Sequence, residues 1–237
     1  MVVAVSGAVD EAELLALTEQ WFGDAAATPA DVPDPAVFTG GEAKLARRIE
    51  QANIVFQMPT VSATDARLPA LRLFTEILGG GMASRLFQSA REERGLAYQV
   101  DAYNEAYEDI GVLGIYAGAA AERTVELAQV CADELRGLAE AGPSDAELAR
   151  AKAVLKAGLW MSDESPASRA GRVAAQTLIY GGLVSSDQSA ERIDGVTTDD
   201  LRAVGQAVVG SGLAATAVLG PKAANGAGAA FVQRLVG

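Results

Sequence analysis

The sequence of 237 residues contains no histidine and only one cysteine, Cys131. Without histidine the chain cannot form a Ser-His or Cys-His nucleophile pair, or a metal site built on imidazole ligands. A single cysteine excludes an internal disulfide and a multi-thiolate zinc site, and it agrees with a reducing compartment. Because Cys131 lies in the apolar run 127–138, we interpret it as a buried structural thiol. If the protein is part of an enzyme, the remaining catalytic groups must come from outside this chain.

Basic residues are also scarce: 19 Lys and Arg stand against 31 Asp and Glu, a formal charge of −12. Nucleic acids and anionic membranes need basic patches, so neither is expected as a partner. The charge is compatible with attracting basic peptides, although acidic charge on proteins commonly serves solubility alone. No apolar stretch reaches the length needed to span a bilayer.

The first 35 residues read differently from the rest of the chain. Residues 2–5 (VVAV) predict a buried strand and residues 10–22 a helix, without the features of a signal peptide. Such a direct entry on a core strand indicates a chain cut from a longer one. Residues 23–41 are rich in Ala, Pro, Asp and Gly and predict a linker.

Hydrophobic periodicity beyond the linker predicts an α+β domain. The expected strands are 44–49, 52–58, 97–103, 111–117 and 214–219, and the expected helices are 65–78, 84–94, 122–140, 144–161, 165–180 and 198–209. Strands in pairs with helices grouped between them indicate a mostly antiparallel sheet with helices packed on one face. The tail 223–237 is Ala- and Gly-rich and only weakly amphipathic.

Several helix boundaries carry local signals. The three glycines at 79–81 predict a helix stop, since glycine tolerates positive φ. Ser144 and Glu147 form a capping-box pattern, and Ser165 followed by Pro166 predicts a helix start. The glycines do not form a phosphate loop, because they follow a helix and lack the Gly-Lys-Ser/Thr ending.

Residues 78–98 (LGGGMASRLFQSAREERGLAY) carry a family resemblance. The segment closely resembles the hallmark stretch of the C-terminal domain in pitrilysin/insulinase-family zinc peptidases of the mitochondrial-processing-peptidase-like branch. Other stretches of the chain also fall in the family's order: QANIVFQMP, GVLGIYAG, ELARAKAVLKAGLWMSDESPASRA and residues 193–208. The opening residues MVVAVSGAVDEAEL look like the last strand and helix of that family's N-terminal domain. The resemblance therefore implies that residues 1–35 are the last strand-helix unit of a preceding domain plus linker, and 36–237 a processing-peptidase/LuxS-like metallohydrolase half.

The resemblance also implies a division of chemistry. Two similar halves enclose a chamber for unfolded peptides, and the N-terminal half binds zinc through an inverted His-x-x-Glu-His motif. The C-terminal half contributes an arginine and a tyrosine seven residues apart, which here are Arg91 and Tyr98. Gly79, Gly80 and Gly81 match a short form of a glycine-rich loop that touches substrate. This chain itself is expected to bind no metal, and its zinc cofactor belongs to the missing half.

Elementary chemistry agrees with these roles. A phenol aimed at the developing oxyanion stabilises the transition state by about 2.7–4 kcal/mol, and a guanidinium fork can hold substrate carbonyls. On the residues alone, Arg91 could instead be a solvated helix arginine and Tyr98 a half-buried strand tyrosine. Arg85 lacks the seven-residue spacing to a tyrosine, and Arg94 is too close to Tyr98. Three further tyrosines are interpreted as packing or chamber-wall residues: Tyr103, Tyr107 and Tyr116.

The sequence thus predicts the zinc-free C-terminal half of a zinc endopeptidase, inactive alone and partnered by a zinc-bearing half and an unfolded peptide. Two alternatives remain: a non-catalytic core or scaffold subunit, and the Arg/Tyr subunit of a two-chain peptidase. A homodimer is a further possible arrangement. The lack of disulfides favours the cytoplasm, with the periplasm as the alternative.

Overall fold

The computed structural model describes residues 1–26 and 33–237, so the predicted linker at 23–41 lies partly outside the described residues. The strands are β1 (Gly41–Ala46), β2 (Gln51–Thr60), β3 (Gln99–Ala106), β4 (Gly111–Ala120) and β5 (Ala215–Gly220). The α-helices are α1 (Glu11–Phe22), α2 (Leu68–Gly79), α3 (Thr124–Ala141), α4 (Asp145–Glu164), α5 (Pro166–Tyr180), α6 (Ser186–Asp194), α7 (Thr198–Gly210) and α8 (Ala227–Val236). A π-helix, η1, spans Phe87–Glu93.

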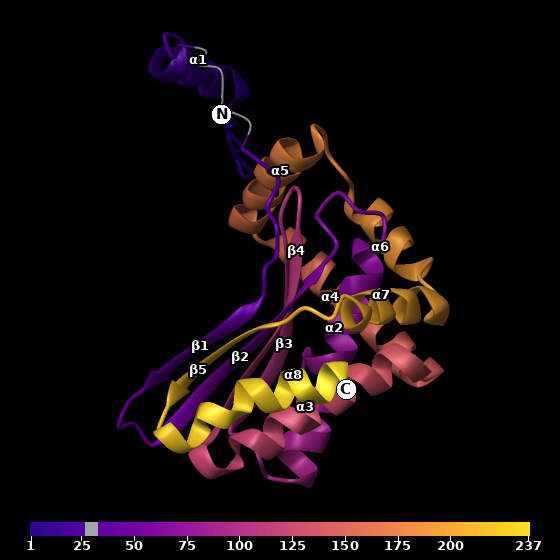
Figure 1. Cartoon of the computed structure of the whole chain (residues 1–237). Helices are drawn as coiled ribbons and strands as arrows, with labels where there is room; N and C mark the ends of the chain where they lie inside the picture. Colours follow the sequence, from indigo (N-terminus) through magenta and orange to yellow (C-terminus); the bar gives the residue numbers. More distant parts are fainter. Residues whose placement is uncertain (27–32) are drawn as a thin grey trace. The chain divides into compact units, whose positions relative to one another are not determined.

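The strands form one sheet in the order β1-β5-β2-β4-β3 (Figure 1). Every neighbouring pair is antiparallel except β1 and β5, which run parallel. The predicted α+β class with a mostly antiparallel sheet is therefore confirmed.

One face of the sheet carries the core. Along β2 buried and half-buried residues alternate, because successive side chains point to opposite faces. The buried set includes Ile54 and Phe56, which join α2, α3, α7 and α8 in one hydrophobic cluster. The Phe56 ring stacks on Phe231 of α8 with centroids 4.0 Å apart. Burial of these aromatic side chains favours folding through both apolar area and ring contact.

The opposite face of the sheet is polar and aromatic. The Tyr116 hydroxyl of β4 donates to Asn53 Oδ1 of β2 at 2.7 Å, and Gln57 Nε2 of β2 donates to the Tyr103 hydroxyl of β3 at 3.2 Å. The Tyr103 ring lies over Gly114, where an added Cβ would be 2.2 Å from the ring. These tyrosines pack on the strands beside them.

The chain divides into two compact units. One contains residues 1–35 and 156–190, and the other contains 36–155 and 191–237. The sequence predicts a division at 35/36 and places residues 156–190 in the C-terminal domain, whereas in the structure residues 156–190 group with the first 35 residues. Residues 2–5 form no strand, so the strand predicted there is wrong.

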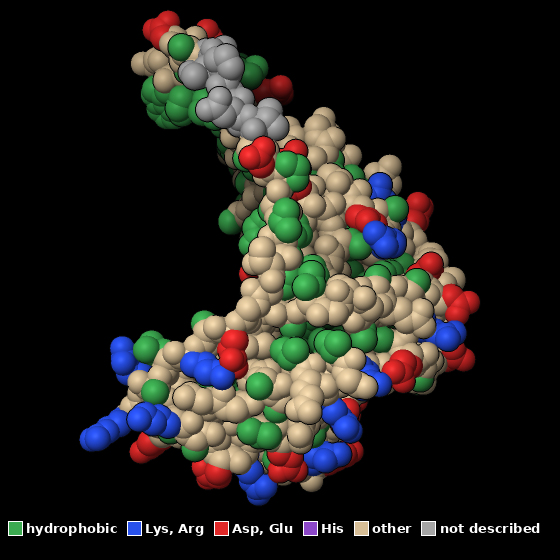
Figure 2. All heavy atoms as spheres, viewed as in Figure 1, with side chains coloured by type: hydrophobic (Ala, Val, Ile, Leu, Met, Phe, Trp, Pro, Cys, Tyr) green, Lys and Arg blue, Asp and Glu red, His purple; other side chains and the backbone are tan. Residues whose placement is uncertain are grey.

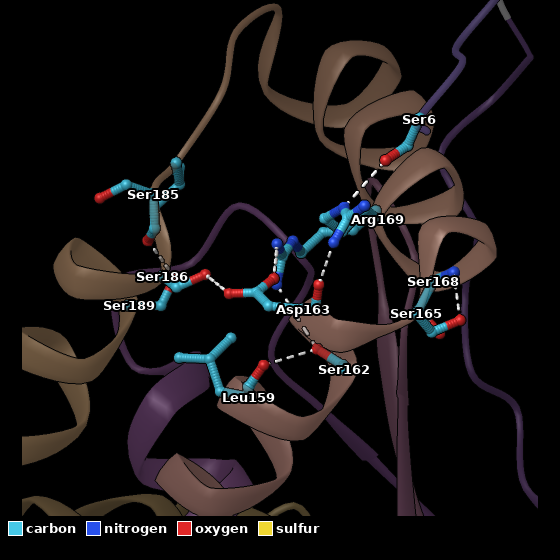
Figure 3. A network of polar contacts seen from close by, with 12 residues as sticks. Ser6, Leu159, Ser162, Asp163, Ser165, Ser168, Arg169, Ser185, Ser186 and Ser189 are labelled. Carbon is cyan, nitrogen blue, oxygen red and sulfur yellow. Dashed lines mark hydrogen bonds and ion pairs between the residues drawn. The ribbon is translucent and has the colours of Figure 1, made fainter. Parts of the chain in front are cut away.

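A polar network orders the smaller unit (Figure 3). The carboxylate of Asp163, near the end of α4, accepts a hydrogen bond from Ser186 of α6 and pairs with Arg172 of α5. Arg169, also on α5, donates from Nε to Ser6 Oγ at 2.8 Å. These contacts connect the N-terminal segment to α5 and α5 to the end of α4. The hydrogen bond from Ser186 and the ion pair with Arg172 lower the pKa of Asp163.

Cys131 is fully buried in α3, as predicted. Among the described residues, no helix is both long enough and apolar enough to cross a bilayer.

Candidate functional site

Arg91 lies on the π-helix η1. The sequence predicts an ordinary helix at 84–94, but Phe87–Glu93 takes the wider i→i+5 turn. Such π-turns are rare and recur at functional sites. The Arg91 side chain is exposed and its guanidinium lies over the Phe87 ring, 4.7 Å from the centroid. A cation over an aromatic face is attracted by the ring quadrupole, so Phe87 limits the positions that the Arg91 head can take.

Gly95 ends the helix and turns the chain toward β3. Its φ of 58° lies in the left-handed region that favours glycine, so it supplies the predicted bend. Leu96 and Ala97 are buried directly after it, and they fix the turn in the core. Tyr98 follows with its backbone N–H bonded to Gly118 O at 2.8 Å. Its side chain is 62% exposed, although that of Leu96 is almost fully buried.

Arg91 and Tyr98 are thus exposed on either side of one sharp turn. Among the described residues, no hydrogen bond joins the two side chains and none involves the Tyr98 hydroxyl. Both polar groups are available to a third molecule.

The three glycines behave differently from one another. The helix α2 does end there, but none of the three has positive φ, so the predicted reason for the stop is wrong. Gly79 is buried because it packs against β3: an added Cβ would lie 2.4 Å from the backbone nitrogen of Ala102. Gly80 and Gly81 are exposed, and a Cβ at Gly81 would meet nothing within 4 Å.

The segment after these glycines is held by the first turns of α4. Arg85 Nε donates to Glu147 Oε1 at 2.7 Å, and Arg85 Nη2 to Glu147 Oε2 at 3.0 Å. Arg150 Nη2 donates to Ala83 O at 3.1 Å. The Arg85 hydrogen bonds, followed by those from Ser144, lower the pKa of Glu147 to about 2 against the opposing effect of burial.

A second carboxylate near these glycines has the opposite shift. Burial raises the pKa of Glu76, on the last turns of α2, and the positive charge of Arg150 partly offsets this. The pKa values of these two carboxyl groups are thus shifted in opposite directions: Arg85 and Ser144 stabilise the anion of Glu147, and burial destabilises the anion of Glu76.

The donor set does not fit a zinc ion. The sequence has no histidine, and the described residues contain no group of three or more Cys, Asp or Glu side chains that could hold a metal.

A family model for the peptidase M16 inactive domain matches residues 1–155. The chain belongs to this family. The predicted resemblance to the C-terminal half of such a peptidase is thereby confirmed.

Relatives and solved structures agree with the family. A protein of Streptomyces coelicolor named an uncharacterized zinc protease is 35% identical over 219 residues, which cover 89% of this chain and 48% of that protein. A zinc protease of Bacillus subtilis, also named uncharacterized, is 30% identical over 203 residues, 84% of this chain and 49% of that protein. This chain therefore spans about half the length of the curated relatives it matches.

Two solved structures share the fold at low identity. The crystal structure of a peptidase M16 inactive domain from Pseudomonas fluorescens has a TM-score of 0.80 at 20% identity, covering 91% of this chain and 52% of that one. A chain of complex III2 from Candida albicans has a TM-score of 0.77 at 20% identity, covering 90% and 53%. At these identities the likeness shows the fold alone.

Sequence reasoning missed the anchoring of this M16 segment. The spacing to a tyrosine predicts no role for Arg85, and the sequence pattern predicts only a capping role for Glu147. The capping-box pattern was a true signal, since Ser144 N donates to Glu147 Oε2 at 2.8 Å. Nothing in the sequence shows that Arg85, 62 residues away, binds the same carboxylate.

Proposed function

We propose that this chain is the zinc-free C-terminal half of a zinc-dependent endopeptidase, which closes the substrate chamber and supplies Arg91 and Tyr98. The observation that carries the proposal is the exposure of both polar groups on either side of the Gly95 turn. A peptide substrate would meet both groups at one edge of the domain.

The two residues have different roles. When a peptide carbonyl is attacked, negative charge develops on its oxygen, and the Tyr98 hydroxyl donates a hydrogen bond to that oxygen. The Arg91 guanidinium, oriented by Phe87, donates to backbone carbonyls of the substrate on either side of the scissile bond. Gly80 and Gly81 allow close approach of the substrate backbone because they carry no side chains, and Gly79 supports them from the core.

The partner in this proposal is a zinc-bearing half, on the same polypeptide or on a separate subunit. The smaller unit supports such a partner, because its helices α1 and α5 contain no buried residue and leave apolar side chains uncovered. Figure 2 shows hydrophobic side chains at the surface of α1. Exposed large apolar residues of this unit include Val3, Val5, Leu15, Trp21, Phe22, Trp160, Met161, Leu178 and Leu183. We infer that residues 1–35 complete the partner half and that the enzyme acts in the cytoplasm.

Two other functions have some support. A non-catalytic scaffold subunit is one alternative, since a chain of complex III2 from Candida albicans has the same fold. A two-chain peptidase, with this chain as its Arg/Tyr subunit, fits the same site equally well. Zinc content and activity of the chain with and without a separately expressed zinc-bearing half separate these cases.

The test of the site is Tyr98→Phe in an active enzyme assembled from this chain and the zinc-bearing half. We expect kcat to fall by about two to three orders of magnitude with little change in KM, because the hydrogen bond strengthens only as charge develops. Arg91→Ala should also raise KM, since Arg91 contacts the bound substrate. Tyr107→Phe is the control, since Tyr107 is similarly exposed but bonds Glu105 at 2.9 Å. Full activity of Tyr98→Phe would refute the assignment.

A further inference from the structure

The loop between α2 and η1 has few bonds of its own. Ser84 N donates to Gly81 O at 3.0 Å, and Gln88 Nε2 donates to Met82 O at 2.6 Å. Gly80 and Gly81 have no side chain with which to anchor it, and glycine backbone is the most permissive of all. The position of this loop must therefore be fixed from outside.

Helix α4 provides that anchor at two points. Arg150 Nη2 bonds the carbonyl of Ala83, and Glu147 holds the Arg85 guanidinium through both carboxylate oxygens. Arg85 Nη2 also donates to Gly142 O at 3.1 Å, just before α4 begins. A planar fork bound at three acceptors has one orientation, which a single-point ammonium cannot reproduce.

Glu147 is itself fixed. Its Oε2 accepts from Ser144 N at 2.8 Å and from Ser144 Oγ at 2.9 Å, while its backbone N–H donates to Ser144 Oγ. The Arg85 and Glu147 side chains are only 22% and 19% exposed. The pair is therefore partly shielded from water, where a bidentate ion pair is stronger than on the open surface.

Arg85 lies at the entry to η1, two residues before Phe87. The next residue, Leu86, is fully buried, so the helix start is fixed on one side by the core and on the other by α4. The Phe87 ring in turn contacts the Arg91 guanidinium. Glu147 thus holds Arg85, the backbone leads from Arg85 to Phe87 two residues later, and the Phe87 ring contacts Arg91.

We propose that Arg85 and Glu147 are positioning residues. They fix the positions of the glycine segment and of the Arg91 guanidinium, and they do not contact the substrate themselves. This inference rests on the proposed function for its catalytic consequence, but its structural part can be tested in the chain alone.

The structural test is hydrogen exchange of the free chain carrying Arg85→Lys, which keeps the charge but loses the fork. Amides of residues 81–95 should exchange faster, whereas those of the central strands β2 and β4 should be unchanged. The matched control is Arg234→Lys, because Arg234 binds Asp133 in the same bidentate way at 2.6 and 3.0 Å, between α8 and α3. Unchanged exchange in 81–95, or an equal increase throughout the larger unit, would overturn the proposal.

The functional test is a double-mutant cycle in the assembled enzyme. Arg85→Lys should lower kcat/KM by about ten- to a hundredfold in the parent, since small displacements of a substrate-holding group have effects of this size. In the Arg91→Ala background the same change should lower kcat/KM by a smaller factor, because one of the two groups that Arg85 positions is gone. A merely structural defect would give the same loss in both backgrounds, and that result would exclude a role through Arg91. The failure of Tyr98→Phe to lower activity would instead refute the proposed function, leaving the exchange result to decide the positioning.

Discussion

The Arg85–Glu147 pair makes a quantitative prediction for stability. Glu147→Gln keeps the shape of the side chain but removes its charge, and it turns an amide N–H₂ toward donors that need an acceptor. In the folded chain the pKa of Glu147 is about 2, against an ordinary value of 4.5. At 1.36 kcal/mol per pKa unit this difference corresponds to about 3.4 kcal/mol at neutral pH. Since the side chain is 19% exposed and water screens part of the interaction, we expect a loss of about 2 kcal/mol.

The pH dependence isolates this effect from general packing damage. A carboxyl group whose pKa is lowered by folding stabilises the fold above its unfolded pKa, and the stabilisation disappears as pH falls through the folded pKa. For Glu147 this window runs from about pH 4.5 down to about pH 2. The difference between the parent chain and Glu147→Gln should be constant from pH 7 to pH 5. At pH 3 it should fall to less than half of its neutral value.

The measurement is urea unfolding of both proteins at a series of pH values from 7 to 3, with the free energies extrapolated to water. Arg234→Lys again controls for loss of a fork elsewhere. A difference that does not change between pH 7 and pH 3 would refute the electrostatic argument. No difference at pH 7 would mean that the pair contributes nothing to stability.

Two other predictions concern residues in the core. Gly79→Ala should lower the free energy of unfolding by about 1–3 kcal/mol, because its Cβ would meet the Ala102 backbone. Gly137→Ala, inside α3 with no atom within 4 Å of the added Cβ, should instead raise the free energy of unfolding by up to about 1 kcal/mol. If denaturant unfolding shows that both substitutions change the free energy in the same direction, the packing argument is wrong. Burial, with a smaller effect of Glu134, raises the pKa of Cys131 to about 12, so iodoacetamide should label it only after unfolding. Labelling of the native chain at the rate of a free thiol, detected by mass, would contradict that placement.

The local signals in the sequence predicted much of the fold. The run at residues 52–58 predicted a strand, and the structure has the central strand β2 there. The capping pattern at Ser144 and the Ser165-Pro166 start both mark real helix ends, since these side chains bond the first backbone N–H groups nearby. Such signals are visible in the sequence because they depend on residues within about four positions of one another.

Elements whose stability comes from distant contacts were harder to predict. Helix α8 falls in the tail that the sequence describes only as weakly amphipathic, and α6 was not predicted. The small residues of α8 permit close packing, and its one large aromatic, Phe231, stacks on Phe56 from the other end of the chain. The reverse error occurred at residues 2–5, whose apolar run predicts a strand that finds no pairing among the described residues.

The candidate site shows the same division. The sequence alone determined the residue types and spacing of Arg91, Gly95 and Tyr98, because a seven-residue interval and a glycine bend are local properties. Only the tertiary structure decided that Gly79 is required by Ala102, and that Arg85 binds Glu147 on α4. Both contacts join segments separated by more than 20 residues, and their free energy depends on close packing and on a geometry shielded from water, which no pattern of neighbouring residues encodes.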